Sequence, residues 1–326
     1  MTEKPKRRWR RRGLITLGVL VTIVVGFALV LRTPSPVGHW NSAEGYDRFV
    51  RIYDQVKEEL PEPAVTRDIR TDFGYVRVYR FDGPSQRAEP LVLLPGRSSA
   101  SPVWAGNMPS LLRVADVYTI DLLGEPGLSV QNKPITSAAD QAAWLNQVLE
   151  ALPEEKFHLV GLSIGGWTAT NLAVRQPAHV AGLTTIDPVY VYDGMPVETM
   201  IRAIPAGIKW LPKSWRDSFN SYTAGGAPVE DEPIADMIEA GMSGYTLRLP
   251  QPQRITEDEL SKLTVPVLAI IAGRSVMHDP KTATATAERA LRNKTVRVYP
   301  EASHAINGEY PDELAADLET FLAKVS

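Results

Sequence analysis

Cysteine is absent from this chain of 326 residues, which excludes disulfide bonds, thiolate metal ligands and a cysteine nucleophile. Histidine is scarce, with five residues, so few side chains are available as a base near neutral pH. The formal net charge of −3 argues against a basic, nucleic-acid-binding surface. The 44% hydrophobic and 22% charged composition is near the globular average, and it predicts a folded protein with a large core and enough length for an insertion.

Basic residues gather at the start of the chain, within residues 1–12, and an uncharged apolar segment follows over residues 13–31 before Arg32. Roughly nineteen residues at helical rise match a bilayer core, so we expect a transmembrane anchor or signal at residues 13–32. The positive-inside rule places residues 1–12 in the cytoplasm and the rest of the chain outside it. No good small-x-small cleavage site is present, which favours an uncleaved single-pass anchor, although cleavage or twin-arginine export at Arg11-Arg12 remains open.

A serine bracketed by glycines is the most informative motif. Residues 161–165 read Gly-Leu-Ser-Ile-Gly, after a run at 156–160 that predicts a buried strand and before a helical pattern at 167–175. Small residues let a strand and a helix approach at a sharp turn. Such a turn exposes the Ser163 hydroxyl and directs the first helical amides, beginning with Ile164, to the same point. The motif predicts a serine nucleophile; the alternative is a chance serine in a small-residue turn.

A serine hydroxyl needs a base, and His304 is the best placed histidine. It follows a strand pattern at 295–299 and sits in a loop just before the last helix, whereas His39, His158 and His179 are expected in packing or on the surface. The order of an elbow serine and a late loop histidine resembles the α/β-hydrolase family, from about residue 66 to the end. The resemblance implies that Ser163 is the nucleophile and His304 the general base.

The acid that would orient His304 has two main candidates. The usual family position after the seventh strand is occupied by Val276, and Asp279, three residues later, precedes Pro280 and a helical run, which predicts an N-cap. Some relatives instead place the acid at the end of the sixth strand, where this chain has Asp187. Resemblance to those relatives favours Asp187, with Asp279, Glu301, Glu309 or no acid at all as alternatives.

The family also implies two backbone amides that hold an oxyanion. A strand pattern at 90–94 ends in Pro95-Gly96-Arg97, so the amides of Arg97 and Ile164 are expected to face each other. Many relatives have His-Gly here, so the donor could differ by one residue, and an ordinary turn is the alternative.

The expected fold is α/β: a mostly parallel, doubly wound α/β-hydrolase sheet with a helical lid insertion, preceded by one N-terminal transmembrane helix. The expected segments are a linker with a short helix at 33–63, the core at 64–187 and 265–326, and a lid at 188–264. The lid carries apolar residues that would line a substrate pocket or form the lid's own core: Met200, Ile204, Ile208, Trp210, Leu211, Trp215, Phe219, Met237, Met242 and Tyr245.

The predicted activity is hydrolysis of esters of partly hydrophobic small molecules through an acyl-enzyme, with no metal or cofactor required. Hydrolysis of amide, thioester or carbon–carbon bonds and a cofactor-free peroxidase activity use the same arrangement and remain open. A dehalogenase or epoxide hydrolase is disfavoured because relatives with that chemistry have Asp at the position of Ser163. A membrane-tethered, non-catalytic binding protein is the alternative from another class.

Overall fold

The computed structural model describes residues 16–23, 34–84, 87, 89–229 and 232–325. The chain divides into two compact units, Met1–Pro36 and Val37–Ser326. Each is described by itself.

The single-pass membrane anchor expected at residues 13–32 is not supported. Residues 16–23 are helical. Among the residues that the structure describes, no helix is both long and apolar enough to cross a membrane. The predicted tethering, and the extracytoplasmic placement that depended on it, are therefore corrected; the rest of the expected segment lies outside the described residues.

The second unit is built on one sheet, in which nine described strands take the order β11-β10-β8-β7-β4-β5-β3-β2, with β6 paired to β3. The strands from β5 through β4, β7, β8 and β10 to β11 run parallel, whereas β2, β3 and β6 pair antiparallel. The strands are β2 (Val65–Thr71), β3 (Gly74–Phe81), β4 (Leu91–Leu94), β5 (Val117–Ile120), β6 (Val130–Gln131), β7 (Phe157–Leu162), β8 (Val180–Ile186), β10 (Val267–Ala272) and β11 (Lys294–Tyr299).

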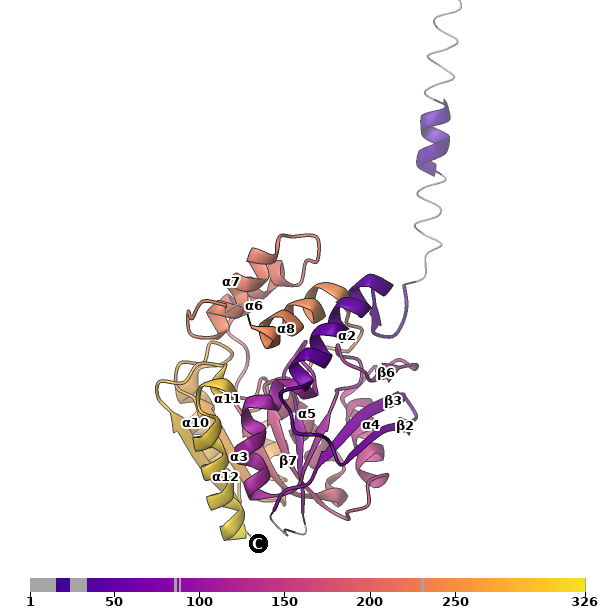
Figure 1. Ribbon diagram of the computed structural model, residues 1–326. Helices are drawn as coiled ribbons and strands as arrows, with labels where there is room; N and C mark the ends of the chain where they lie inside the picture. Colours follow the sequence, from indigo (N-terminus) through magenta and orange to yellow (C-terminus); the bar gives the residue numbers. More distant parts are fainter. Residues whose placement is uncertain (1–15, 24–33, 85–86, 88, 230–231, 326) are drawn as a thin grey trace, which may run out of the picture. The chain divides into compact units, whose positions relative to one another are not determined.

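Both faces of this sheet are covered by helices (Figure 1). Val92 and Leu94 of β4 join one core cluster with α4 (Ala138–Glu150), α5 (Ile164–Arg175) and α10 (Pro280–Ala290). Leu91 and Leu93 alternate to the other cluster, with α2 (Ala43–Lys57), α3 (Met108–Val114) and α12 (Pro311–Val325). Strand side chains point to opposite faces in turn, so β4 is buried along its whole length. The expected mostly parallel α/β sheet is confirmed.

Local sequence signals fix several element boundaries. Ser137 and Asp140 form a capping box at the start of α4, and Asp279 caps α10, whose first residue is Pro280. Strands β2 and β3 form an antiparallel hairpin. Shorter elements are η1 (Ser101–Asn107), η2 (Pro177–His179), α11 (Ile306–Glu309), and the antiparallel pair β1 (His39–Trp40) and β9 (Tyr245–Thr246).

Between β8 and β10 the chain forms α6 (Val197–Ala206), α7 (Lys213–Thr223), α8 (Pro233–Gly244) and α9 (Glu257–Ser261). The first three lie together at one end of the sheet, with α8 beside α2 (Figure 1). Buried Glu239 of α8 binds Arg216 of α7 at 2.9 Å and Arg48 of α2 at 2.7 Å. The apolar residues expected in this segment differ in burial: Met237 is fully buried, whereas Trp210 is 83% exposed.

Candidate active site

Ser163 lies at a sharp turn between β7 and α5, with φ 54° and ψ −117°. A non-glycine residue with positive φ is strained, and the surrounding structure must hold it in place. Two glycines make that possible. A Cβ at Gly165 would lie 2.1 Å from the Leu94 carbonyl oxygen, and one at Gly161 would lie 2.4 Å from the Gly165 backbone. The strand and helix therefore approach as closely as the sequence predicted.

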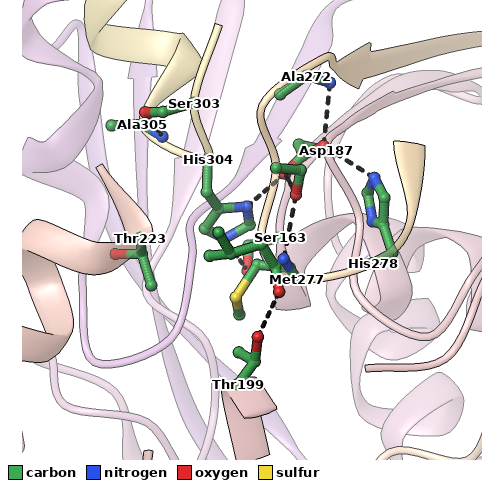
Figure 2. Close-up of polar contacts among 12 residues, drawn as sticks. Ser163, Asp187, Thr199, Thr223, Ala272, Met277, His278, Ser303, His304 and Ala305 are labelled. Carbon is green, nitrogen blue, oxygen red and sulfur yellow. Dashed lines mark hydrogen bonds and ion pairs between the residues drawn. The ribbon is translucent and has the colours of Figure 1, made fainter. Parts of the chain in front are cut away.

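The His304 side chain bridges Ser163 and Asp187 (Figure 2). Its Nε2 lies 2.9 Å from Ser163 Oγ, and its Nδ1 lies 2.6 Å from Asp187 Oδ2. A carboxylate only accepts hydrogen bonds, so Nδ1–H donates to Asp187 and Nε2 is left to accept the serine proton. Residues far apart in the chain thus form one continuous hydrogen-bonded series.

Asp187 follows the last residue of β8 and is fully buried. Its Oδ1 accepts the Ala272 N–H at 3.0 Å, and its Oδ2 accepts the Ser275 hydroxyl at 2.7 Å as well as His304 Nδ1–H. Burial alone would raise the pKa of Asp187, but the hydrogen bond to His304 and the ion-pair contacts with His278 and His304 outweigh it and hold that pKa well below its usual value. Asp187 is therefore a carboxylate at neutral pH.

The other acids considered from the sequence lie elsewhere. Asp279 is exposed, and its Oδ1 accepts the Thr282 N–H at 2.8 Å as the N-cap of α10. Glu309 accepts both the N–H and the hydroxyl of Ser303, at 2.8 and 2.6 Å, and so holds the loop that carries His304. Glu301 is exposed. Of these four acids, Asp187 is the one that contacts His304.

Two amides expected to serve as oxyanion donors border Ser163. A Cβ at Gly96 would lie 3.7 Å from the Ser163 Cβ, which places the β4 loop beside the serine. Gly96 O accepts the Ser99 hydroxyl at 2.8 Å, and because a trans peptide is planar, the following Arg97 N–H points the opposite way. The Ile164 N–H belongs to the first turn of α5, where amides lack intrahelical acceptors. Among the described residues, neither amide donates to a protein acceptor.

Sequence reasoning missed His278. Its Nε2 lies 3.1 Å from Asp187 Oδ1, and its side chain has no exposed surface. It comes from the loop between β10 and α10, directly before Asp279. The one hint in the sequence is the scarcity of histidine, since His278 is one of five, but no local pattern assigns it a partner.

Helices α6 and α7 touch the loops that carry these side chains. The buried Thr199 hydroxyl of α6 donates to the Val276 carbonyl at 2.5 Å. The Thr223 carbonyl at the end of α7 accepts the His304 backbone N–H at 3.2 Å. Thr199 and Thr223 both lie around Ser163 and His304 in Figure 2.

The chain is similar in sequence and in fold to known carboxylesterases. Carboxylesterase YbfK of Bacillus subtilis is 26% identical over 286 residues, covering 84% of this chain and 93% of the relative. The uncharacterized carboxylesterase nap of the same organism is 26% identical over 275 residues, covering 81% and 90%. The crystal structure of carboxylesterase CesB (YbfK) superposes with a TM-score of 0.79 at 24% identity, covering 86% of this chain and 99% of that one.

The model of the alpha/beta hydrolase fold family matches residues 89–311, which include the serine turn, Asp187 and His304. The resemblance inferred from the sequence is therefore confirmed, and the chain belongs to the α/β-hydrolase fold family.

Proposed function

We propose that this protein is a serine hydrolase that cleaves carboxylic esters of partly hydrophobic small molecules through an acyl-enzyme. The observation that carries the proposal is the hydrogen-bonded series from Ser163 Oγ through His304 to Asp187, at 2.9 and 2.6 Å. The carboxylesterase names of two relatives that match along most of their length support the ester bond as the target.

The proposed reaction has two steps. Ser163 Oγ attacks the ester carbonyl while His304 Nε2 takes its proton, and the amides of Arg97 and Ile164 hold the oxyanion. His304 then protonates the leaving alkoxide, which leaves as an alcohol. Water, deprotonated by the same imidazole, attacks the acyl-serine and releases the carboxylic acid. Asp187 keeps the proton on Nδ1 and stabilises the imidazolium.

A fluorophosphonate probe tests this assignment because it reacts only with an activated serine. We expect labelling of the folded protein, no labelling of Ser163→Ala, and labelling slowed about 10³-fold or more in His304→Ala. His179→Ala is the matched control, since His179 bonds the Glu155 carbonyl on a surface connection. A folded protein that is not labelled, or that is labelled equally in Ser163→Ala, contradicts the proposal.

We also propose that α6, α7 and α8 form a lid over this site. The contacts of Thr199 with Val276 and of Thr223 with His304 support it. Exposed apolar side chains lie on α6 and on the connection from α6 to α7, including Ile204 at 62% and Trp210 at 83% exposure, which favour an apolar acyl or alcohol group. p-Nitrophenyl esters of increasing acyl length provide the test: kcat/KM should rise from acetate to a medium-length chain, and a maximum at acetate contradicts the preference.

A further inference from the structure

Two imidazoles share the carboxylate of Asp187 (Figure 2). His304 Nδ1 lies 2.6 Å from Oδ2, and His278 Nε2 lies 3.1 Å from Oδ1. The hydrogen-bonded series from Ser163 to Asp187 includes the His304 ring. The second is wholly buried on the opposite oxygen of the same carboxylate.

Satisfying Asp187 does not require His278. Oδ1 already accepts the Ala272 N–H at 3.0 Å, and Oδ2 already accepts the Ser275 hydroxyl at 2.7 Å. A position without solvent exposure would be filled most simply by an apolar side chain, because burying a polar ring is unfavourable unless it is bonded or charged beside a counter-ion. The position of His278 beside a buried carboxylate therefore points to an electrostatic role.

The charges around His278 are mainly negative. Asp187 at the end of β8, Asp193 in the loop that follows and Asp279 at the start of α10 all interact with it. On the positive side, Arg254 lies 3.7 Å from Asp193, Lys281 interacts with Asp279, and His304 lies across Asp187.

These surroundings favour a proton on the buried ring. Burial is the largest single influence and opposes the charged form, but the ion-pair contact with Asp187 at 3.1 Å and the charge of Asp193 raise the pKa of His278 above its ordinary value.

We propose that His278 is a positioning residue that carries a proton and, through the shared carboxylate of Asp187, sets the pH dependence of the proton transfer that activates Ser163. The inference rests on the proposed function. A positive ring on Oδ1 draws on the same negative charge that would stabilise a second imidazolium on Oδ2, so the charges of the two rings are coupled through Asp187. Loss of the charge at Oδ1 should therefore change the pH dependence of the reaction.

The test is the pH profile of kcat/KM for p-nitrophenyl butyrate. His278→Gln keeps a neutral amide donor for Asp187 and removes the charge, so its acidic limb should move upward by about 0.5–1 pH unit. His179→Gln, which alters a surface histidine, should leave the limb unchanged. A limb that stays in place in an active, folded His278→Gln protein overturns the proposal, because a purely structural role would lower kcat without moving it.

NMR of ¹⁵N-labelled imidazoles in a Ser163→Ala background tests the same charge without turnover. Both ring nitrogens of His278 should carry protons near pH 6, and a neutral ring from about pH 5 to 8 overturns the proposal. This measurement also serves if His278→Gln does not fold. If the protein is not a serine hydrolase, the fluorophosphonate does not label the unaltered protein. The NMR measurement still determines the charge of His278 in that case, so the two failures can be told apart.

Discussion

The carbonyl oxygen of Thr223 lies 3.2 Å from the backbone nitrogen of His304, so helix α7 ends on the residue that bonds Ser163. The turn beyond Thr223 is held by Arg274, whose guanidinium donates to the Gly225 carbonyl at 3.0 Å. Arg274 belongs to the loop after β10, as does Ser275, which bonds Asp187. The end of α7 and the loops that present His304 and Asp187 are therefore linked by hydrogen bonds.

Arg274→Ala should loosen this link without removing any group from the series of Ser163, His304 and Asp187. An exposed charged hydrogen bond contributes about 0.5–1 kcal/mol, so we expect kcat/KM to fall about two- to fivefold. Hydrogen exchange should rise at the amides near residues 221–227. Arg292→Ala, on the exposed segment after α10, is the control and should match the unaltered protein. Unchanged exchange in the Arg274 variant would show that the link does not hold the turn.

Asp187→Asn and Asp279→Asn separate the two acids that the sequence left open. Asn cannot fix the His304 proton on Nδ1 as a carboxylate does, so Asp187→Asn should lower kcat/KM about 10³- to 10⁴-fold. Asn replaces Asp well as an N-cap, so Asp279→Asn should keep both activity and melting temperature. Steady-state kinetics and thermal melts on the two proteins provide the test. Loss of turnover in Asp279→Asn alone would reverse the assignment.

The backbone demands of the site could be read from the sequence. Gly161 and Gly165 have no room for a side chain, and that crowding is why the motif around Ser163 is recognisable in one chain. The carboxyl ends of parallel strands meet at one edge, which is why Asp187 and His304 could be expected near the serine. The choice between Asp187 and Asp279 depends on which carboxylate packing turns toward His304, and no local pattern contains that information.

Two features lay outside such patterns. Hydropathy measures how apolar a segment is, and it does not establish a helix long enough to span a bilayer. The anchor predicted for residues 13–32 was not supported, since no such helix was found within the part of the chain that the structure describes. His278 was missed because it resembles an ordinary residue before an N-cap. What distinguishes His278 is its contact with the fully buried carboxylate of Asp187 at the end of the neighbouring strand β8. The two residues are far apart in the sequence, so no local pattern shows this contact.

Gly165→Ala should damage both the fold and the site. The added Cβ would lie 2.1 Å from the Leu94 carbonyl oxygen, so the strand or the helix must shift, and overpacking of this kind costs about 1–3 kcal/mol. Urea unfolding and fluorophosphonate labelling should both show the loss. Gly106→Ala is the control because a Cβ there meets nothing within 4 Å. Equal stability of the two variants would mean that the turn has more freedom than its contacts indicate.

His158 should make stability depend on pH below about 6.5. Burial, together with the charge of Arg87, lowers the pKa of His158 to about 3, so between that value and about 6.5 the unfolded chain binds a proton that the folded protein does not. Its contribution is present above about pH 6.5 and is lost as pH falls, by at most about 1.4 kcal/mol per pH unit. The pKa of His278 is raised, so its contribution to the free energy of unfolding has the opposite pH dependence: it is lost as pH rises above about 6.5.

Urea unfolding of His158→Gln between about pH 5 and 6.5 checks this. The free energy of unfolding should depend less steeply on pH than in the unaltered protein, even if the absolute stability falls. Gly106→Ala, which alters no titratable group and places its Cβ in open space, should keep the original slope. An unchanged slope in His158→Gln would show that the ring takes a proton in the folded state.

Glu125 should hold in place the loop of residues 96–99, which carries the proposed oxyanion donor Arg97. It is almost fully buried; its Oε2 accepts the Ser98 N–H at 3.1 Å, and its Oε1 lies 3.6 Å from Arg97 Nη1. Ser98 has φ 58°, a strained conformation that this contact helps to hold. Burial raises the pKa of Glu125, while the charge of Arg97 and the Ser98 hydrogen bond act against that change.

Glu125→Ala leaves the Ser98 N–H without its acceptor, so the Arg97 amide should lose its alignment. We expect kcat to fall about 10- to 100-fold, less than the 10²- to 10³-fold loss when a donor is removed outright. Glu125→Gln keeps a neutral acceptor of the same shape and should stay within about threefold. A boronic acid that forms a tetrahedral adduct should bind Glu125→Ala more weakly. The KM for the ester substrate should stay nearly unchanged, because only the tetrahedral state uses the oxyanion donors. Equal weakening of boronate binding and KM would instead assign Glu125 to substrate binding.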